Sequence, residues 1–328
     1  MAQEFKNIAI IHPAAIGDIM FGTPVAAALK ANYPDARLTY WTHESLFGLL
    51  KLCQSVDAMT PFERKAGLLE QRKQLSQLNA DLIVDLAGST RTKLITLFNK
   101  ARVLTHNKAN FKSRTELHIV DSMFSTIEPL NLQSNHDKYP TLTPNKTLLQ
   151  SIFEPAYTAK QEGKQLIALV PSVGTLRPHR AWPSDKWIAL LEKILAQPNL
   201  YPVLIGGKED EEICVKISNA FNGKVPTLAG RLTLPETATL LSCCTQVVSA
   251  DTGPAHLAVA VGTPVLGLYG PTLPARNGPY GNNKTIDNCR ECKCFTSKFC
   301  TETTDVGPGV CMQQIETDKV WSGFISSH

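Results

Sequence analysis

The chain has 328 residues, about twice the usual length of a domain, which predicts two domains. Hydrophobic residues make up 43% and charged residues 19%, a balance typical of globular enzymes rather than of disordered chains. The net charge of +4 suits anionic substrates or a membrane surface, and it is too small to indicate a nucleic-acid partner.

Neither a membrane span nor a signal peptide is predicted. No apolar run reaches the roughly 18 residues that a spanning helix needs. The apolar segment after Lys6 is broken by His12, Pro13 and Asp18, unlike the apolar part of a signal peptide. We therefore expect a cytosolic protein.

The first half alternates short apolar strands with helices. Strands are predicted at 7–12, 38–41, 56–59, 81–86 and 102–105, and helices at 19–33, 43–52, 67–78, 91–99 and 117–124. Gly17 and Asp18 are expected on the loop between the first strand and the first helix. This alternation predicts a parallel, doubly wound sheet.

The second half repeats the alternation after a polar, turn-rich stretch at 129–144. Strands are predicted at 166–170, 202–205, a segment ending near Val248, and 265–269, with helices at 183–196, 208–221, 235–243 and 317–325. We therefore predict domains at 1–145 and 146–328, the second with a cysteine-rich loop at 289–311 and a terminal helix. Ligands are expected at the carboxyl ends of the strands, where such sheets bind them.

One stretch, S-A-D-T-G-P-A-H-L-A-V-A-V-G-T-P at 249–264, reads as a strand end, a turn and a short buried helix. Pro254 is expected at the first helical position, where its missing N–H costs nothing. The start of such a helix directs unpaired N–H groups at one point, which makes it a ready phosphate site. The alternative is an ordinary crossover in which Asp251 caps the helix.

Three segments together resemble glycosyltransferase family 9, the ADP-heptose:lipopolysaccharide heptosyltransferases. They are A-A-I-G-D-I-M-F-G-T-P near the start, R-P-H-R-A-W-P in the middle, and the stretch that begins at Ser249. The resemblance implies a GT-B fold, in which two Rossmann-like domains face each other across a cleft. The first domain would bind the acceptor and the second the nucleotide sugar. It also implies transfer with inversion at the anomeric carbon, without a metal or other cofactor.

By this resemblance Asp18 is the catalytic base that takes a proton from the acceptor hydroxyl, although an aspartate there could also be a helix N-cap. Arg180 stands where relatives usually carry lysine and would neutralise the leaving diphosphate. Arg177 is a competing candidate for that role. A solvated loop is the structural alternative for both arginines.

The resemblance assigns the remaining donor contacts to the second half. Phosphate contacts are expected from Thr175, Thr252, Gly253 and His256. Ribose contacts are expected from Glu209 or Glu212. Leu232 would line the base pocket, and Asp251 would bind a sugar hydroxyl or orient the turn. Each has a structural alternative: His256 and Leu232 could be packed core residues, and the glutamates could favour a helix N-terminus.

A basic set in the first half suits an anionic glycolipid acceptor held at the inner-membrane surface. Its predicted members are Ser89, Thr90, Arg91, Lys93, Lys108, Lys112 and Arg114. A solvated charged face is the alternative for any one of them. His12 replaces a basic or polar residue that relatives often carry, which leaves the acceptor open.

Nine cysteines are present, and five of them, including Cys294, lie between 289 and 311. Cys289, Cys292, Cys300 and Cys311 could bind a structural zinc or an iron–sulfur cluster, or they could be thiols or a disulfide. Two functions other than transfer also stay open, a nucleotide-sugar epimerase or hydrolase of the same fold and a metal-binding interaction protein.

Overall fold

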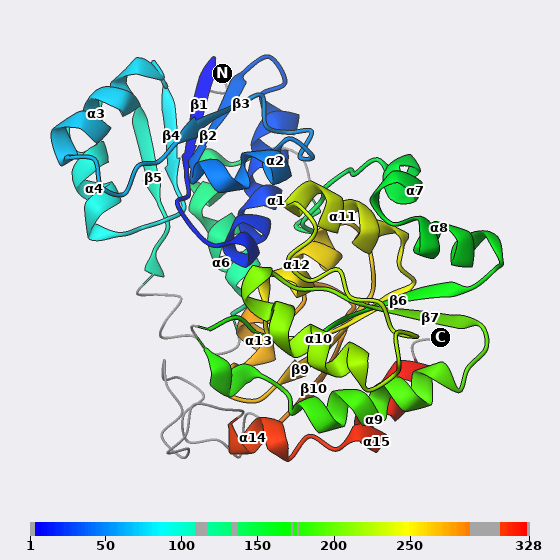
Figure 1. Cartoon of the computed structure of the whole chain (residues 1–328). Coiled ribbons are helices and arrows are strands. Elements are labelled where there is room, and N and C mark those ends of the chain that lie inside the picture. The colour runs from blue at the N-terminus through cyan, green and yellow to red at the C-terminus, as the bar shows by residue number, and fades with distance from the viewer. Residues whose placement is uncertain are drawn as a thin grey trace. The chain divides into compact units, whose positions relative to one another are not determined.

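The computed structural model describes residues 4–108, 117–132, 137–171, 173–175, 177–288 and 309–326. The chain divides into two compact units, Met1–Thr143 and Pro144–His328, each built on its own five-stranded sheet (Figure 1). No helix in the described ranges is long and apolar enough to cross a membrane.

The first unit carries a parallel sheet in the order β3-β2-β1-β4-β5. Its strands are β1 (Asn7–Ile11), β2 (Arg37–Thr42), β3 (Ala58–Pro61), β4 (Leu82–Asp85) and β5 (Arg102–Thr105). Its helices include α1 (Ile16–Asn32), η1 (Glu44–Leu46), α2 (Phe47–Leu50), α3 (Leu68–Gln77), α4 (Thr90–Thr96), α6 (Ile119–Phe124) and η2 (Ser125–Leu130). The strand order reverses between β1 and β4, which creates the switch point where such sheets bind ligands.

Helices cover both faces of this sheet, as expected for buried parallel strands. Figure 1 shows α3 and α4 on one side of the strands and α1 with α6 on the other. Leu75 of α3 and Ile95 of α4 pack in one core with Ile11 and Ile83 of the sheet. The faces of α3 and α4 opposite this core are therefore exposed.

The second unit carries a parallel sheet in the order β10-β9-β8-β6-β7. Its strands are β6 (Gln165–Val170), β7 (Leu200–Leu204), β8 (Gln246–Ala250), β9 (Val265–Tyr269) and β10 (Lys284–Asp287). Its helices are η3 (Lys146–Leu148), α7 (Leu149–Ile152), α8 (Glu154–Gln161), η4 (Pro178–Arg180), α9 (Ser184–Leu195), η5 (Lys208–Asp210), α10 (Glu211–Asn219), α11 (Leu234–Cys243), α12 (Gly253–Ala260), α13 (Pro274–Asn277), α14 (Val310–Gln313) and α15 (Thr317–Ile325). Here the switch point lies between β6 and β8.

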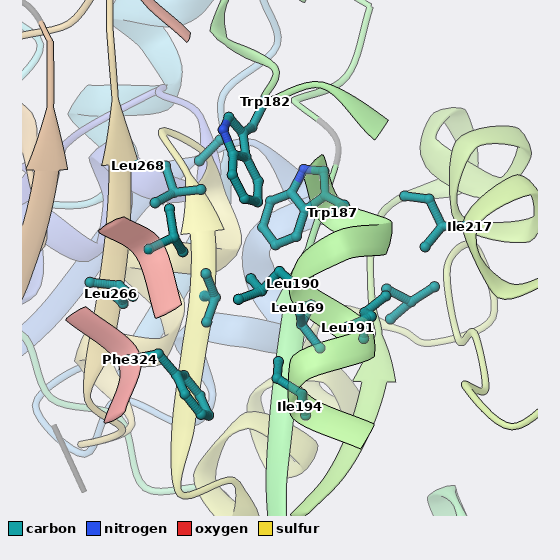
Figure 2. Close-up of a cluster of buried hydrophobic side chains, with 14 of the residues drawn as sticks. Leu169, Trp182, Trp187, Leu190, Leu191, Ile194, Ile217, Leu266, Leu268 and Phe324 are labelled. Atoms are coloured by element: carbon teal, nitrogen blue, oxygen red, sulfur yellow. The ribbon is translucent and has the colours of Figure 1, made fainter. Parts of the chain in front are cut away.

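The core of the second unit lies between its sheet and helices α9, α10 and α15 (Figure 2). Trp182 and Trp187 meet edge to face, with ring centroids 5.0 Å apart. The apolar face of α9, which includes Leu190 and Ile194, packs on Leu169 of β6. Because aromatic and branched side chains fill this layer, burial fixes how α9 and the loop before it lie on the sheet.

The predicted pair of doubly wound parallel sheets is confirmed, and several local expectations are wrong. Asp18 lies inside the first turn of α1 and not on the preceding loop. Strand β10 and helices α7, α8 and α13 were not predicted. Among the described strands β10 pairs with β9 alone, and two of its four residues are exposed. Its sequence therefore lacks the apolar run that indicates a strand.

Candidate active site

The switch point of the second sheet brings together loops from three strands. The loop after β6 carries Arg180, the loop after β7 carries Glu209, and the loop after β8 carries Asp251. All three strands are parallel, so their carboxyl ends lie at one edge of the sheet. This edge is where a doubly wound sheet binds its ligand.

Arg180 is held by its neighbours in the chain. It ends the short 3₁₀ helix η4, and two residues later the buried Trp182 donates its indole N–H to the carbonyl of Ile315, 2.9 Å away. The carbonyl of His179 accepts the backbone N–H of Gly309. Packing and hydrogen bonds therefore fix the backbone on both sides of the guanidinium.

Asp251 lies between two cationic or potentially cationic side chains. One carboxylate oxygen is 2.5 Å from Nη1 of Arg180, and the other is 3.9 Å from Nε2 of His256. Burial alone would raise the pKa of Asp251, but His256 and the charge of Arg180 outweigh burial and hold it below its ordinary value. Asp251 is therefore a carboxylate that orients Arg180 and His256.

The helix after Asp251 starts as a phosphate site requires. Thr252 is the N-cap in extended conformation, Gly253 is the first helical residue, and Pro254 follows it, one position later than predicted. The hydroxyl of Thr252 lies 3.1 Å from that of Ser249 and makes no capping hydrogen bond. Asp251 precedes the N-cap, so the alternative in which Asp251 caps the helix is wrong. Among the described residues no side chain caps α12, so its first N–H groups are oriented as an anion site needs, and anion binding there stays a prediction.

Asp210, which was not singled out in the sequence, joins two loops of this site. Its buried carboxylate accepts the backbone N–H of Gly174 at 3.1 Å and that of Gly207 at 2.8 Å. Gly174 has a φ of +67°, and the Glu209 carboxylate lies beside it. Asp210 therefore ties the loop after β6 to the loop after β7. Gly207 and Asp210 stand three residues apart, the spacing of a capping box, and this spacing is the sequence signal for Asp210. Only the half made by the Asp210 carboxylate forms, because glycine has no side chain to accept in return.

The other predicted donor residues lie on the loops and helix starts at this edge of the sheet. Among the described residues, no hydrogen bond or ion pair joins them to one another. Thr175 and Arg177 are exposed on the loop after β6. Glu209 is exposed in η5, and Glu212 is exposed in the first turn of α10. Leu232 is half-buried just before the capping box that begins α11. Their roles stay predictions.

In the first unit, Gly22 fixes the position of the predicted base. A Cβ at Gly22 would lie 2.6 Å from the hydroxyl of Tyr40 and 2.7 Å from Nδ1 of His12, so α1 packs closely on these two side chains. Residues four apart share a helix face. Asp18, which is exposed, therefore lies one turn closer to the carboxyl edge on the same side of α1.

Two buried histidines follow β1 and β5. Nδ1 of His12 is 2.8 Å from the Tyr40 hydroxyl, and Nε2 of His106 is 2.8 Å from that of Ser122. Burial, with His106 and Lys108 nearby, lowers the pKa of His12 to about 3. Burial and Lys108 lower the pKa of His106 to about 4. Both rings are therefore neutral near pH 7.

Asp85 ends β4 between these histidines and accepts the N–H of Gly88 at 3.0 Å. Burial raises the pKa of Asp85 despite the hydrogen bonds to its ionised form. Gly88 has a φ of +50°, and a Cβ there would meet the carbonyl of His106. Asp85 thus shapes the loop that leads into α4.

Several predicted acceptor residues have structural partners in this loop and helix. Ser89 forms a capping box with Thr92, and Arg91 donates to Gln71, at 2.8 Å, and to the carbonyl of Ala66. Thr90, Lys93 and Lys108 are exposed. Arg91 therefore ties α4 to α3, and acceptor binding by this set stays a prediction.

The remaining predictions fall partly outside the described residues. Lys112 and Arg114, with Cys289, Cys292, Cys294 and Cys300, lie outside them. Cys311 is buried. Within the described part of the chain, no cluster of three or more His, Cys, Asp or Glu side chains is arranged to hold a metal ion.

Comparison with known proteins decides the family. A profile of glycosyltransferase family 9 (heptosyltransferase) matches residues 68–303. The chain therefore belongs to glycosyltransferase family 9. Its relatives in this family include lipopolysaccharide heptosyltransferase 3 of Escherichia coli, 25% identical over 81% of this chain and 84% of the relative. Lipooligosaccharide heptosyltransferase 2 of Haemophilus influenzae is 26% identical over 85% and 88%.

Solved structures extend this family relationship to the fold. A family 9 glycosyltransferase of Veillonella parvula covers 100% of this chain and 98% of its own, with a TM-score of 0.81 and 18% identity. The E. coli ADP-heptose LPS heptosyltransferase II covers 98% of both chains, with a TM-score of 0.74 and 20% identity. The predicted GT-B fold is confirmed.

Proposed function

We propose that this family 9 glycosyltransferase moves a heptose, or a related sugar, from ADP-heptose or a similar nucleotide sugar onto a lipopolysaccharide core or another cell-envelope glycan. The observation that carries the proposal is the group formed by Arg180, Asp251 and His256 beside the N-terminus of α12. A guanidinium and a helix start at one point are suited to a leaving diphosphate. The names of the relatives support heptose as the sugar.

The proposed reaction inverts the anomeric carbon. The carboxylate of Asp18 takes the proton of the acceptor hydroxyl, whose oxygen bonds to the anomeric carbon from the face opposite the diphosphate. The bond between that carbon and the phosphate oxygen breaks, and the nucleoside diphosphate leaves with the bonding electrons. Arg180 and the N–H groups of α12 neutralise the charge that develops on it.

No metal ion is required in this proposal, because Arg180 and the helix start supply the positive charge that a metal would otherwise provide. We expect the transfer rate to be unchanged after treatment with EDTA. A structural zinc on the cysteine set would be a separate matter, detected by elemental analysis of the purified protein, and it would not take part in transfer.

The acceptor in the proposal is an anionic glycolipid, so the enzyme works as a peripheral protein at the cytoplasmic face of the inner membrane. The exposed Lys93 and Lys108 of the first unit suit such an acceptor. The sugar donor binds the second unit.

The test is the Asp18→Ala variant with ADP-heptose as donor. Transfer is expected to fall by about 10²–10⁴-fold, the range that a general base contributes. The melting temperature should still rise with ADP-heptose as in wild type, because the donor is held by the second unit. Transfer at the wild-type rate by Asp18→Ala would overturn the base assignment, and release of sugar from the donor without any acceptor would favour hydrolysis.

A further inference from the structure

The outward faces of α3 and α4 carry apolar side chains that the fold leaves exposed. Figure 1 shows the two helices side by side at one edge of the first unit. Leu69 of α3 is 83% exposed, and Phe98, just after α4, is 84% exposed. Leu94 and Leu97 are exposed as well. Large apolar side chains grouped in this way on a protein surface mark a binding face.

Hydrogen bonds join the two helices that carry these side chains. Leu75 and Ile95 pack on the sheet, and helical spacing turns Leu69 and Leu94 away from these buried sides, toward solvent. Nη2 of Arg72 donates to the carbonyl of Leu97 at 2.8 Å, which joins the end of α4 to α3. We name this surface, made of Leu69, Leu94, Leu97 and Phe98 with its neighbouring charges, the α3–α4 outer face.

Phe98 is unusual in its backbone as well as in its exposure. Its φ is +62°, in the left-handed region that bulky side chains rarely adopt. A residue in this conformation costs free energy, of order 1–3 kcal/mol. Burial of its ring does not repay that cost, because the ring lies in solvent. The residue therefore points to a role in binding rather than in folding.

Exposed cations outnumber exposed carboxylates in the segments that carry the α3–α4 outer face. Lys73 lies one helical turn after Leu69, and Lys93 lies one turn before Leu97. The two segments 63–73 and 90–100 carry exposed cations at Arg64, Lys65, Lys73, Lys93 and Lys100, and exposed carboxylates only at Glu63 and Glu70. An apolar centre with a basic surround is the pattern of proteins that bind the interface of an anionic membrane.

We infer that the α3–α4 outer face binds the surface of an anionic lipid bilayer, with Leu69 and Phe98 inserted among the headgroups and the lysines on the lipid phosphates. A second copy of the chain is a poorer occupant, because a two-fold contact would set the same cations against each other. The inference rests on the proposed function, since a lipid-linked acceptor requires the enzyme to reach a membrane.

The experiment measures co-sedimentation of the full chain with two kinds of vesicle. One is phosphatidylcholine alone, and the other mixes it with phosphatidylglycerol. Wild type should bind the mixed vesicles more tightly.

Phe98→Asn should weaken that binding about tenfold, by loss of one buried aromatic side chain. Its thermal stability should be unchanged or higher, because asparagine tolerates the left-handed backbone. One cation contributes about fivefold to the binding of an anionic membrane. Lys73→Glu removes a cation and adds an anion, so it should weaken binding by more than that.

A matched control lies in the second unit. Leu148 has the same exposure as Leu97, 47%, so Leu148→Ser should bind like wild type whereas Leu97→Ser should bind more weakly. Equal binding of wild type and Phe98→Asn to the mixed vesicles would overturn the inference. Concentration-dependent self-association that Phe98→Asn abolishes would also overturn it, in favour of a second copy.

A second assay separates this inference from the proposed function. Transfer is measured from ADP-heptose to an acceptor oligosaccharide without acyl chains, which needs no membrane. Phe98→Asn should transfer to it at the wild-type rate. If wild type transfers to no acceptor but binds the mixed vesicles through this face, the proposed function fails and the membrane site stands.

Discussion

At the scale of single residues, Asp251 shows how one carboxylate can organise a cationic site. It contacts both Arg180 and His256, and its pKa is held low, so it stays ionised between them. An anion beside a proposed diphosphate site looks unfavourable if charges are simply added. Asp251 contributes by fixing the orientation of Arg180. A paired guanidinium keeps one orientation, whereas a free one occupies many rotamers.

We expect Asp251→Asn to separate binding from catalysis. Loss of the carboxylate raises the net positive charge of the site, so ADP should bind as tightly as in wild type or more tightly. Arg180 loses its orientation, so kcat should fall at least tenfold, about 1.4 kcal/mol. Titration calorimetry with ADP and steady-state kinetics measure the two effects.

The matched control for this variant is Asp185→Asn, which makes the same change at an exposed position of α9. It should leave both ADP affinity and kcat unchanged. Weaker ADP binding by Asp251→Asn with an unchanged kcat would contradict the orienting role. Partial rescue of kcat by Asp251→Glu, which restores the charge at a different distance, would support it.

His12 and His106 predict an acid-sensitive first unit. Their folded pKa values, about 3 and about 4, lie below the unfolded value of about 6.5. Below that unfolded value the unfolded chain takes up protons that the folded chain does not, so the free energy of unfolding falls as pH falls. Between about pH 7 and about pH 5 each histidine should remove on the order of 2 kcal/mol.

Urea unfolding at a series of pH values measures this loss. His12→Gln has no group that titrates in the window, so its stability should fall less steeply with acid than that of wild type, even if it is lower at neutral pH. A variant with the same slope as wild type would show that His12 does not remain neutral in the folded unit.

At the scale of elements, close backbone packing positions the candidate residues. The start of α12 sets Thr252 and Gly253 at the end of β8, and Asp210 ties two further loops to the same edge. In the first unit, Gly22 lets α1 approach His12 and Tyr40. The helices therefore determine where the proposed base and the phosphate contacts lie.

Gly22→Ala tests this packing in α1. The added Cβ would lie 2.6 Å from the Tyr40 hydroxyl, so helix or side chain must shift. We expect a loss of about 1–3 kcal/mol in stability, typical of overpacking, and a fall in kcat as Asp18 moves. Gly67→Ala is the control, because nothing lies within 4 Å of a Cβ there. Equal stability of the two variants in thermal unfolding would contradict the close approach.

At the scale of the whole molecule, the two sheets have different strand orders. The first has the order 3-2-1-4-5, and the second, numbered within its own unit, has the order 5-4-3-1-2. Each has one switch point, and the predicted donor residues gather at the second. The domain roles that the resemblance implies, acceptor first and donor second, follow this division and stay predictions.

Hydrogen exchange with and without ADP tests the division. ADP should slow exchange in the loops of the second unit at 173–183, 206–212 and 251–256. It should leave 86–91 of the first unit unchanged. A ligand at about 100 times its Kd also stabilises the folded state by about 2.7 kcal/mol, which a thermal shift detects. Protection centred on 86–91 would place the nucleotide in the first unit.

Much of this architecture was predictable from sequence. Apolar strands alternating with helices predict two parallel sheets, because buried strands must be apolar on both faces. The stretch at 249–264 predicts the helix start that the structure has at Gly253, because Thr-Gly-Pro after a buried strand is typical of one. Phosphate binding there stays a prediction. Strand β10 and helix α8 escaped prediction because their sequences are polar and their stability comes from neighbouring elements.

The sequence by itself determined the sheets, the family resemblance and the candidate residues at the loop ends, because each depends on local pattern. Only the tertiary structure decided which of those residues meet. It paired Asp251 with Arg180, about 70 residues apart, and bound Arg91 to Gln71. It also joined Arg72 of α3 to the carbonyl of Leu97. Such contacts depend on how strands order in a sheet and helices cross it, and no local pattern records that order.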